Sequence, residues 1–231
     1  MLKRMIAILG ALWAFSVSAA EPVRTVGIYV QPYYEAAREA GSTPRVRVNK
    51  QFDALFASAK REDIVAARDG VAAKPQLVTP MTLMVLAIRL YDMGLRDDAV
   101  FWFYAAKERA IVLAQVLDMR ARGLAQADEA VRSFAVLAGP VINGYAFCDL
   151  GKQREILAKA IDWVEQNPYA VMFMDRLPAL PGDRPANHRR AIADARARAA
   201  KERAQLDGAK AVAAFKAARR QNGADEKYCW K

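Results

Sequence analysis

Apolar residues recur at helical spacing along most of this chain, and this periodicity limits its fold more than any other feature. From Asn49 onward the apolar positions lie three or four residues apart, as in Phe52, Leu55 and Phe56. The 231 residues include only 12 Gly and 10 Pro, which is too few for the many turns of an all-β sandwich. We therefore predict an all-α fold, built as an array of antiparallel helical hairpins.

Turn and cap residues divide this array. Thr79-Pro80 predicts a helix start, because threonine caps helix N-termini and proline fits the first turn. Asn167-Pro168 and residues 180–183 are the clearest breaks. From Thr79 onward, helices are expected over 80–93, 96–119, 125–137, 140–150, 153–166 and 185–220, the last with a break at Asp207-Gly208 as an alternative.

Residues 26–48 are the exception to the helical pattern. Val26–Val30 and Val46–Val48 are rich in β-branched residues and are separated by Pro32 and by Gly41–Pro44. Such composition is typical of strands bounded by turns. We expect either a short N-terminal β-ribbon or an extended segment packed on the helical body.

The first twenty residues predict a secretory signal peptide. Lys3 and Arg4 precede an uncharged stretch from Met5 to Val17, and small residues follow up to Ala20. The apolar stretch is shorter than the ~20 residues that span a bilayer, although an uncleaved anchor is the alternative. We expect cleavage after Ala20, and a periplasmic or secreted mature chain with no transmembrane segment.

Export changes how the two cysteines are interpreted. In an oxidising compartment an even pair usually forms a disulfide, so we predict a bond between Cys148 and Cys229. It would tie the C-terminal tail to the body. The alternatives are two free thiols, or a catalytic Cys148 paired with His188. Two Cys and one His are too few for a structural zinc site, and we expect no metal and no cofactor.

Residues 83–106 carry a regular pattern of large, small and aromatic side chains, at Leu86, Ala87, Leu90, Gly94, Ala99, Phe103 and Ala106. This spacing resembles the tetratricopeptide repeat, a helical hairpin with such residues at fixed intervals. A second, weaker unit begins near Val136 and has Gly144, Phe147, Gly151 and Pro168 in register. The distance from Gly94 to Gly151 exceeds one repeat, so an additional helix is expected between the units.

The resemblance implies a binding surface. In the repeat family the first helix of each unit faces a concave groove that binds peptides, which here implies a protein partner. By register, the groove would contain Met84, Ile88, Tyr91, Asp92, Val141, Tyr145 and Asp149. Core packing or a solvated surface is the alternative for the same residues.

Residues 101–104 are four consecutive aromatic residues. They cannot share one helix face, because neighbours point about 100° apart. Either this helix is central and enclosed on most sides, or Trp102 and Tyr104 are exposed as an aromatic recognition patch.

Positive charge is concentrated near the C-terminus. The chain has a formal net charge of +10, and residues 183–231 alone contain thirteen Lys or Arg against six Asp or Glu. The last long helix is then either a solvated helix or a basic face for an acidic protein, anionic lipid or lipopolysaccharide. The face would contain Arg189, Arg190, Arg196, Lys201 and Arg203. Nucleic acid is not expected as the partner of an exported protein.

Catalytic motifs are missing from the sequence. It has no G-x-S-x-G, H-E-x-x-H, Walker A or G-x-G-x-x-G pattern. His188 lies among arginines at a helix start, where we expect an exposed, titrating side chain. If the protein were a glycosidase acting through one protected glutamate, the candidate catalytic residues would be Glu108, Glu129 and Glu155. No feature of the sequence favours one of them.

These observations predict an interaction module rather than an enzyme. We expect residues 1–20 to be the signal peptide, 21–182 a helical-hairpin domain with an extended N-terminal segment, and 183–231 a basic helix and tail packed on the same domain. The predicted function is an exported, periplasmic adaptor that binds a protein segment. The alternatives are a periplasmic inhibitor or immunity-type protein that neutralises an enzyme, and a cell-envelope hydrolase.

Overall fold

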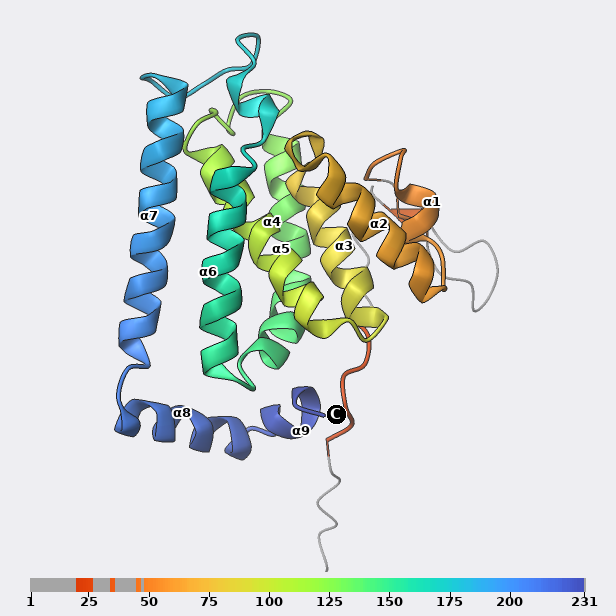
Figure 1. Ribbon diagram of the computed structural model, residues 1–231, viewed down its shortest axis with the longest axis vertical. Helices are drawn as coiled ribbons and strands as arrows, with labels where there is room; N and C mark the ends of the chain where they lie inside the picture. Colours follow the sequence, from red (N-terminus) through yellow and green to blue (C-terminus); the bar gives the residue numbers. More distant parts are fainter. Residues whose placement is uncertain (1–19, 27–33, 36–44, 47, 231) are drawn as a thin grey trace, which may run out of the picture.

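The computed structural model describes residues 20–26, 34–35, 45–46 and 48–230, and within them the chain is all-α (Figure 1). The all-α part of the predicted fold class is thereby confirmed. Residues 1–19, which make up nearly all of the expected signal peptide, lie outside the described residues. None of the described helices combines the length and the apolar composition that crossing a bilayer requires.

The first half of the chain contains α1 (Asp53–Phe56), α2 (Arg61–Ala73), the 3-10 helix η1 (Pro75–Leu77), α3 (Pro80–Asp92) and α4 (Arg96–Ala114). The second half contains α5 (Ala125–Ala146), α6 (Leu150–Gln166), the 3-10 helix η2 (Ala170–Phe173), α7 (Arg184–Gln205), α8 (Ala209–Gln221) and α9 (Ala224–Tyr228). Before them, β1 (Tyr34–Glu35) pairs antiparallel with β2 (Arg45–Val46) in a two-residue ribbon. The expected ribbon used Val26–Val30 instead, and residues 27–33 and 47 lie outside the described part.

Helix α4 is the centre of the fold. Helices α3, α5, α6 and α7 all pack against it. Its aromatic run is enclosed accordingly: Trp102, Phe103 and Tyr104 are at most 5% exposed. Trp102 lies edge-on to both Phe101 and Trp163, with ring centroids 5.1 Å apart in each pair. The enclosed-helix interpretation is therefore confirmed, and Trp102 and Tyr104 do not form an exposed recognition patch.

The α3–α4 hairpin forms as its sequence pattern predicts. The Thr79 hydroxyl accepts a hydrogen bond from the backbone N–H of Thr82 at 3.1 Å, which caps α3. Gly94 has φ +75° between the two helices, a conformation that only glycine adopts at little cost. Ala99 and Phe103 are buried on α4, where they face α3 and the other surrounding helices.

The second expected unit does not repeat this geometry. Helix α6 packs chiefly against α4 rather than against α5, its neighbour in sequence. Gly151 lies inside α6 and not at a turn. Gly144 instead accommodates α9, since a Cβ there would lie 2.6 Å from the Tyr228 ring. The described helices therefore form a bundle around α4 and not a stack of equivalent hairpins.

Two helix boundaries differ from those expected. Helix α5 continues through Pro140, where a break was predicted. Pro140 lies on the exposed side of the helix, where the backbone hydrogen bond that proline removes is least costly. The long C-terminal helix is broken at Gly208, which has φ +117°, as the alternative interpretation allowed. Helix α8 consequently turns across the base of the bundle (Figure 1).

A disulfide joins Cys148, after α5, to Cys229, after α9, as predicted. The two Cα atoms are 5.6 Å apart, and the residues are separated by 81 positions in sequence. Arg219 supports the junction. Its guanidinium donates to the carbonyl oxygen of Gly144 at 3.0 Å and to the Asp225 carboxylate at 2.7 Å. The C-terminal tail is thus fixed to the body both covalently and by hydrogen bonds.

One guanidinium is buried in the core without a carboxylate partner among the described residues. Arg109 of α4 is 1% exposed and donates to the carbonyl oxygens of Pro75, Val78 and Asn167 at 2.7–2.8 Å. Its charged end lies 4.4 Å from the centroid of the Trp163 ring. Burial lowers the pKa of Arg109 to about 10, so the side chain stays protonated at neutral pH.

Replacing Arg109 should therefore destabilise the whole fold. A lysine at this position offers one point charge for three carbonyl oxygens, so we expect Arg109→Lys to lower the free energy of unfolding by about 2–4 kcal/mol. The exposed change Arg132→Lys on α5 is the control, with an expected effect within about 0.5 kcal/mol. Urea unfolding followed by circular dichroism measures both, and equal stability of the two variants would contradict this role.

Removing the disulfide should also be costly, because it closes a loop of 81 residues. The loop-entropy relation gives about 4 kcal/mol for a loop of this order. We expect the Cys148→Ser/Cys229→Ser variant to lose a stability of this order in urea unfolding. Two alkylated thiols in the unreduced native protein, measured by intact mass, would show that the bond does not form.

Candidate functional site

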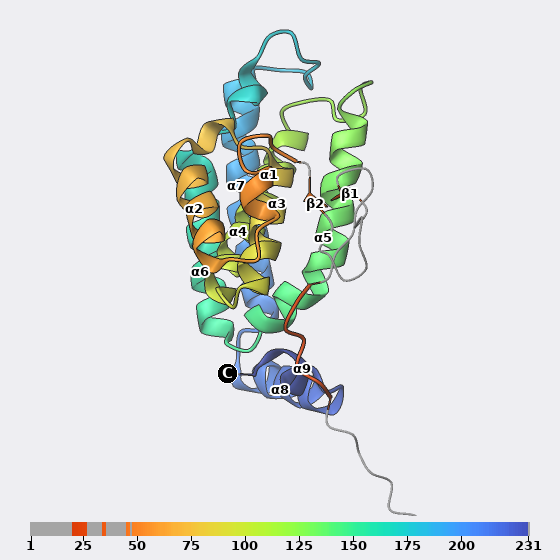
Figure 2. The ribbon, with the colours of Figure 1, turned by 90° about the vertical axis from the view of Figure 1, so that its right-hand side faces the viewer.

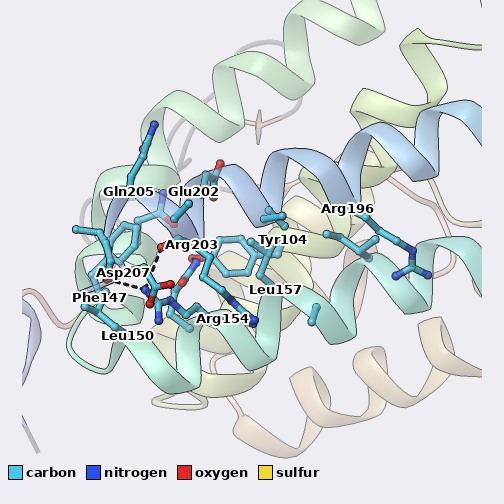
Figure 3. Close-up of a pocket in the computed structure, with 18 of the residues that line it drawn as sticks. Tyr104, Phe147, Leu150, Arg154, Leu157, Arg196, Glu202, Arg203, Gln205 and Asp207 are labelled. Atoms are coloured by element: carbon cyan, nitrogen blue, oxygen red, sulfur yellow. Dashed lines mark hydrogen bonds between the residues drawn. The ribbon is translucent and has the colours of Figure 1, made fainter. Parts of the chain in front are cut away.

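A cleft with a volume of about 520 Å³ lies between α6 and α7 (Figure 3). Helices α4 and α5 supply its floor. Its lining residues are Tyr104, Lys107, Asn143, Phe147, Leu150, Gln153, Arg154, Leu157, Ala158, Ile161, Arg196, Ala199, Ala200, Glu202, Arg203, Ala204, Gln205, Leu206 and Asp207. The volume lies within the range of about 300–1,000 Å³ that is usual for ligand sites.

The cleft exists because α7 packs on the bundle along only half of its length. The buried residues of α7 all precede Arg196. Beyond that point its side toward α6 carries Ala199, Ala200 and Ala204, which are too small to fill the space. Arg154 of α6 nevertheless holds the end of α7, donating to the carbonyl oxygens of Arg203 at 3.3 Å and Leu206 at 2.9 Å. Carbonyls at a helix C-terminus attract a cation, so the far end is fixed while the cleft stays open.

The floor of the cleft is mainly apolar. Tyr104 is 4% exposed, and its hydroxyl accepts a hydrogen bond from the Gln153 side chain at 3.2 Å. Leu157 and Ile161 follow on the same side of α6. At the lower end, Phe147 lies edge-on to Phe215 of α8, with ring centroids 5.7 Å apart. An apolar floor of this kind favours ligands with apolar side chains or rings.

The rim carries more positive than negative charge: Lys107, Arg154, Arg196 and Arg203 against Glu202 and Asp207. Arg196 is paired outside the cleft with Asp162, at 2.6 Å, and with Glu165. Lys107 and Arg203 make no ion pair with any described residue. These two cations are therefore available to an acidic ligand.

The groove residues of α3 that the repeat resemblance implies are placed in the core or beneath the chain's own N-terminal segment. Met84 and Ile88 are at most 2% exposed. The Tyr91 hydroxyl donates to the carbonyl oxygen of Val23 at 3.0 Å, and the Asp92 carboxylate accepts from the Val26 N–H at 2.9 Å. This surface does contact an extended segment, but the segment is the chain's own.

The groove residues of α5 take part in the same junction. Val141 is half-buried, and Tyr145 lies edge-on to Tyr91 with centroids 6.5 Å apart. The Arg96 guanidinium is held between Tyr145, at 4.4 Å, and Trp230, at 4.0 Å. Asp149 caps α6 by accepting from the Lys152 N–H. Apart from Asp149, which is exposed at the start of α6, these positions are occupied by intramolecular contacts.

Both ends of the described chain meet at this junction (Figures 1 and 2). The Val23 N–H donates to the carbonyl oxygen of Lys227 at 2.8 Å, and the Trp230 indole N–H donates to that of Val23 at 3.3 Å. Arg24 lies over the Trp230 ring at 4.7 Å.

The predicted basic residues of α7 do not form one surface. Arg189, Arg196 and Arg203 are seven residues apart and share one side of the helix, whereas Arg190 and Lys201 lie on another. Within the first group only Arg196 and Arg203 line the cleft. Arg190 donates to the Asn187 side chain at 2.7 Å.

The residues considered for catalysis are dispersed. Cys148 is in the disulfide and offers no thiol. His188 is 9% exposed and lies against Phe173, so the expectation of an exposed histidine is wrong. Burial also lowers the pKa of its imidazole. Glu108 is buried and paired with Arg198 at 2.9 Å, while Glu129 and Glu155 are exposed outside the cleft. No group of His, Cys, Asp and Glu within the described residues could hold a metal ion.

Three tyrosines of these two surfaces give a test of the packing. Burial raises the pKa of Tyr91, Tyr104 and Tyr145 to about 12 each, whereas an unfolded tyrosine titrates near about 10. The folded state therefore keeps these protons longer. The stability that these tyrosines contribute is complete below pH 10 and is lost as the pH rises from about 10 to about 12. The loss is up to about 1.4 kcal/mol per pH unit for Tyr104 and less for the half-buried Tyr145, where solvent screens the charge. Tyr104→Phe should remove the contribution of Tyr104 to this loss, so the free energy of unfolding should fall less steeply between about pH 10 and about pH 12. Urea unfolding at several pH values measures this dependence, and an unchanged pH dependence would contradict the burial of Tyr104.

Comparisons with known proteins give one informative match. No protein-family model matches the chain, and no solved structure matches it. An uncharacterized protein of Haemophilus influenzae is 33% identical over 229 residues, covering 98% of this chain and 88% of that protein. Identity at this level along nearly the whole length shows that the chain belongs to the same family as this Haemophilus influenzae protein.

Proposed function

We propose that this protein is an exported interaction module, an adaptor without enzymatic activity, that binds a segment of another protein in the α6–α7 cleft. The observation that carries the proposal is the cleft itself, which has an apolar floor and, on its rim, two cations that make no ion pair within the described part of the chain. Export is part of the proposal. It is supported by the basic and apolar N-terminal sequence and by the disulfide, which suits an oxidising compartment.

The chemistry of the cleft suggests what kind of segment binds. Phe147, Leu150 and Leu157 form an apolar surface that apolar side chains of the partner can cover. Lys107 and Arg203 at the rim favour an acidic residue beside them. The alanines of α7 allow a backbone to approach closely. The expected ligand is therefore a short acidic segment with two or three apolar side chains.

We also retain the tetratricopeptide-like relationship of the α3–α4 hairpin as part of the proposal. Its turn glycine and its small buried residues support the relationship. The binding surface nevertheless differs from the one that the resemblance implies, because residues 23–26 lie along α3. The cleft lies on the other side of α4, against α6 and α7.

Filling the cleft should abolish this binding. Ala200 is exposed and lines the cleft, whereas Ala197 is exposed on the same helix and does not line it. We expect peptides selected from a random library on the native protein to be acidic and apolar. They should bind Ala200→Trp at least about tenfold more weakly and Ala197→Trp as strongly as the native protein, in fluorescence anisotropy. Lys107→Glu should weaken the same peptides, with a loss that shrinks at high salt.

Equal binding to both tryptophan variants would show that the cleft is not the site.

Capture from an envelope extract with the same two variants identifies the natural partner. It is the protein that Ala197→Trp retains and Ala200→Trp loses. If that partner is an enzyme whose activity falls in proportion to the amount of this protein added, the module acts as an inhibitor or immunity-type protein. If it is not inhibited, the module acts as an adaptor.

A further inference from the structure

A second surface lies at the opposite end of the bundle from the cleft. The 3-10 helices η1 and η2 contact each other, and together with the residue after η2 they expose three large apolar side chains. Leu77 is 62% exposed, Phe173 38% and Met174 36%. We call these three residues the apolar tip. Among the described residues, the other exposed large apolar side chains are Val136 and Leu137, both on α5.

The apolar tip is held in place by hydrogen bonds from neighbouring elements. Arg184, at the start of α7, donates to the carbonyl oxygens of Met172 at 2.9 Å and Leu177 at 2.6 Å. The loop that follows is joined to the end of α4, since the Asp118 N–H donates to the carbonyl oxygen of Pro178 at 3.1 Å. The exposure of Phe173 and Met174 is therefore a property of the folded structure.

The segments around the apolar tip are strongly basic. They are Lys74 before η1, the loop 118–123, the loop 174–183 and the first two turns of α7. They carry seven cationic residues, Lys74, Arg120, Arg122, Arg176, Arg184, Arg189 and Arg190, against three acidic ones, Asp118, Asp175 and Asp183. Glu165 of α6 also acts on His188 beside Phe173, but it is paired with Arg196. Two of the acidic residues already have partners: Asp118 accepts from Arg120, and Asp183 caps α7.

We propose that the apolar tip docks on an anionic lipid bilayer. Exposed apolar side chains surrounded by Lys and Arg match the surface of such a membrane. The apolar groups reach the boundary between headgroups and acyl chains, while the cations meet the phosphates of the headgroups. The net positive charge around the tip favours anionic over neutral lipid. A protein partner would need a large acidic surface around an apolar pocket to match the same arrangement.

The position of the apolar tip keeps this docking separate from the cleft. Helix α7 begins beside the tip at Arg184 and reaches the cleft in its second half, ending at Gln205. Its 22 residues span roughly 30 Å. A protein docked through the tip therefore holds the cleft away from the lipid surface (Figure 1).

Vesicle sedimentation tests the proposal, with the protein produced by export and purified with its disulfide formed. The vesicles are phosphatidylcholine alone, or phosphatidylcholine with about a third phosphatidylglycerol, at about 0.1 M salt. We expect binding to the anionic vesicles only. The Leu77→Ser/Phe173→Ser/Met174→Ser variant should lose at least about tenfold in vesicle affinity. The matched control Val136→Ser/Leu137→Ser, which also removes exposed apolar side chains, should bind as the native protein does.

A second readout distinguishes insertion from surface attraction. Tryptophan emission of Phe173→Trp should shift to the blue when anionic vesicles are added, and that of Val136→Trp should not. Ala200→Trp should leave vesicle binding unchanged, so the failure of the cleft proposal and the failure of this one can be told apart. Native-like vesicle binding by the triple variant would overturn the proposal. It would also be overturned by equal binding to neutral vesicles, or by a captured protein that depends on the tip when no vesicles bind.

Discussion

The buried guanidinium of Arg109 is the contact on which the arrangement of this protein depends. A charge in the core is costly unless other interactions compensate it, and here hydrogen bonds to three backbone carbonyls and the face of Trp163 supply that compensation. The carbonyls belong to Pro75, the first residue of η1, to Val78, its C-cap, and to Asn167, the C-cap of α6. One side chain of α4 therefore fixes both ends of η1 and the segment that leads to η2.

This contact also determines where the exposed apolar side chains lie. Because Pro75 and Asn167 share one guanidinium, η1 and η2 are brought side by side. Leu77 and Phe173 then lie on two adjoining 3-10 helices although they are far apart in sequence. Neither helix alone exposes enough apolar surface to serve as a docking site, so the apolar tip is a product of the core around Arg109.

Features with local causes could be predicted from the sequence, and features set by distant packing could not. The Thr79 cap, the Gly94 turn and the burial of Phe52 and Phe56 all follow from spacing within one or two helical turns. His188 was expected to be exposed because arginines flank it. It is buried because η2 folds back and places Phe173 against it, a contact that the sequence near His188 does not indicate.

The same distinction applies to the binding surfaces. The resemblance to a repeat family pointed to α3, but residues 23–26 and the C-terminal tail lie on that surface. The cleft depends on the separation of α6 and α7. The sequence feature that corresponds to it is the set of alanines in the second half of α7. An alanine-rich helix is equally compatible with close packing, so only the position of α7 reveals the cleft.

The half-packed state of α7 connects the two surfaces. Ala191, Ile192 and Ala195 bring its first half against the bundle, next to the apolar tip, while Ala199, Ala200 and Ala204 leave a space beside its second half. Arg154 prevents that second half from separating, because it holds the carbonyls at the end of the helix. The first half is thus a rigid support for contact with a flat surface, and the second half is one wall of a cleft for a chain segment. A single helix, packed at one end and tethered at the other, is sufficient to position both.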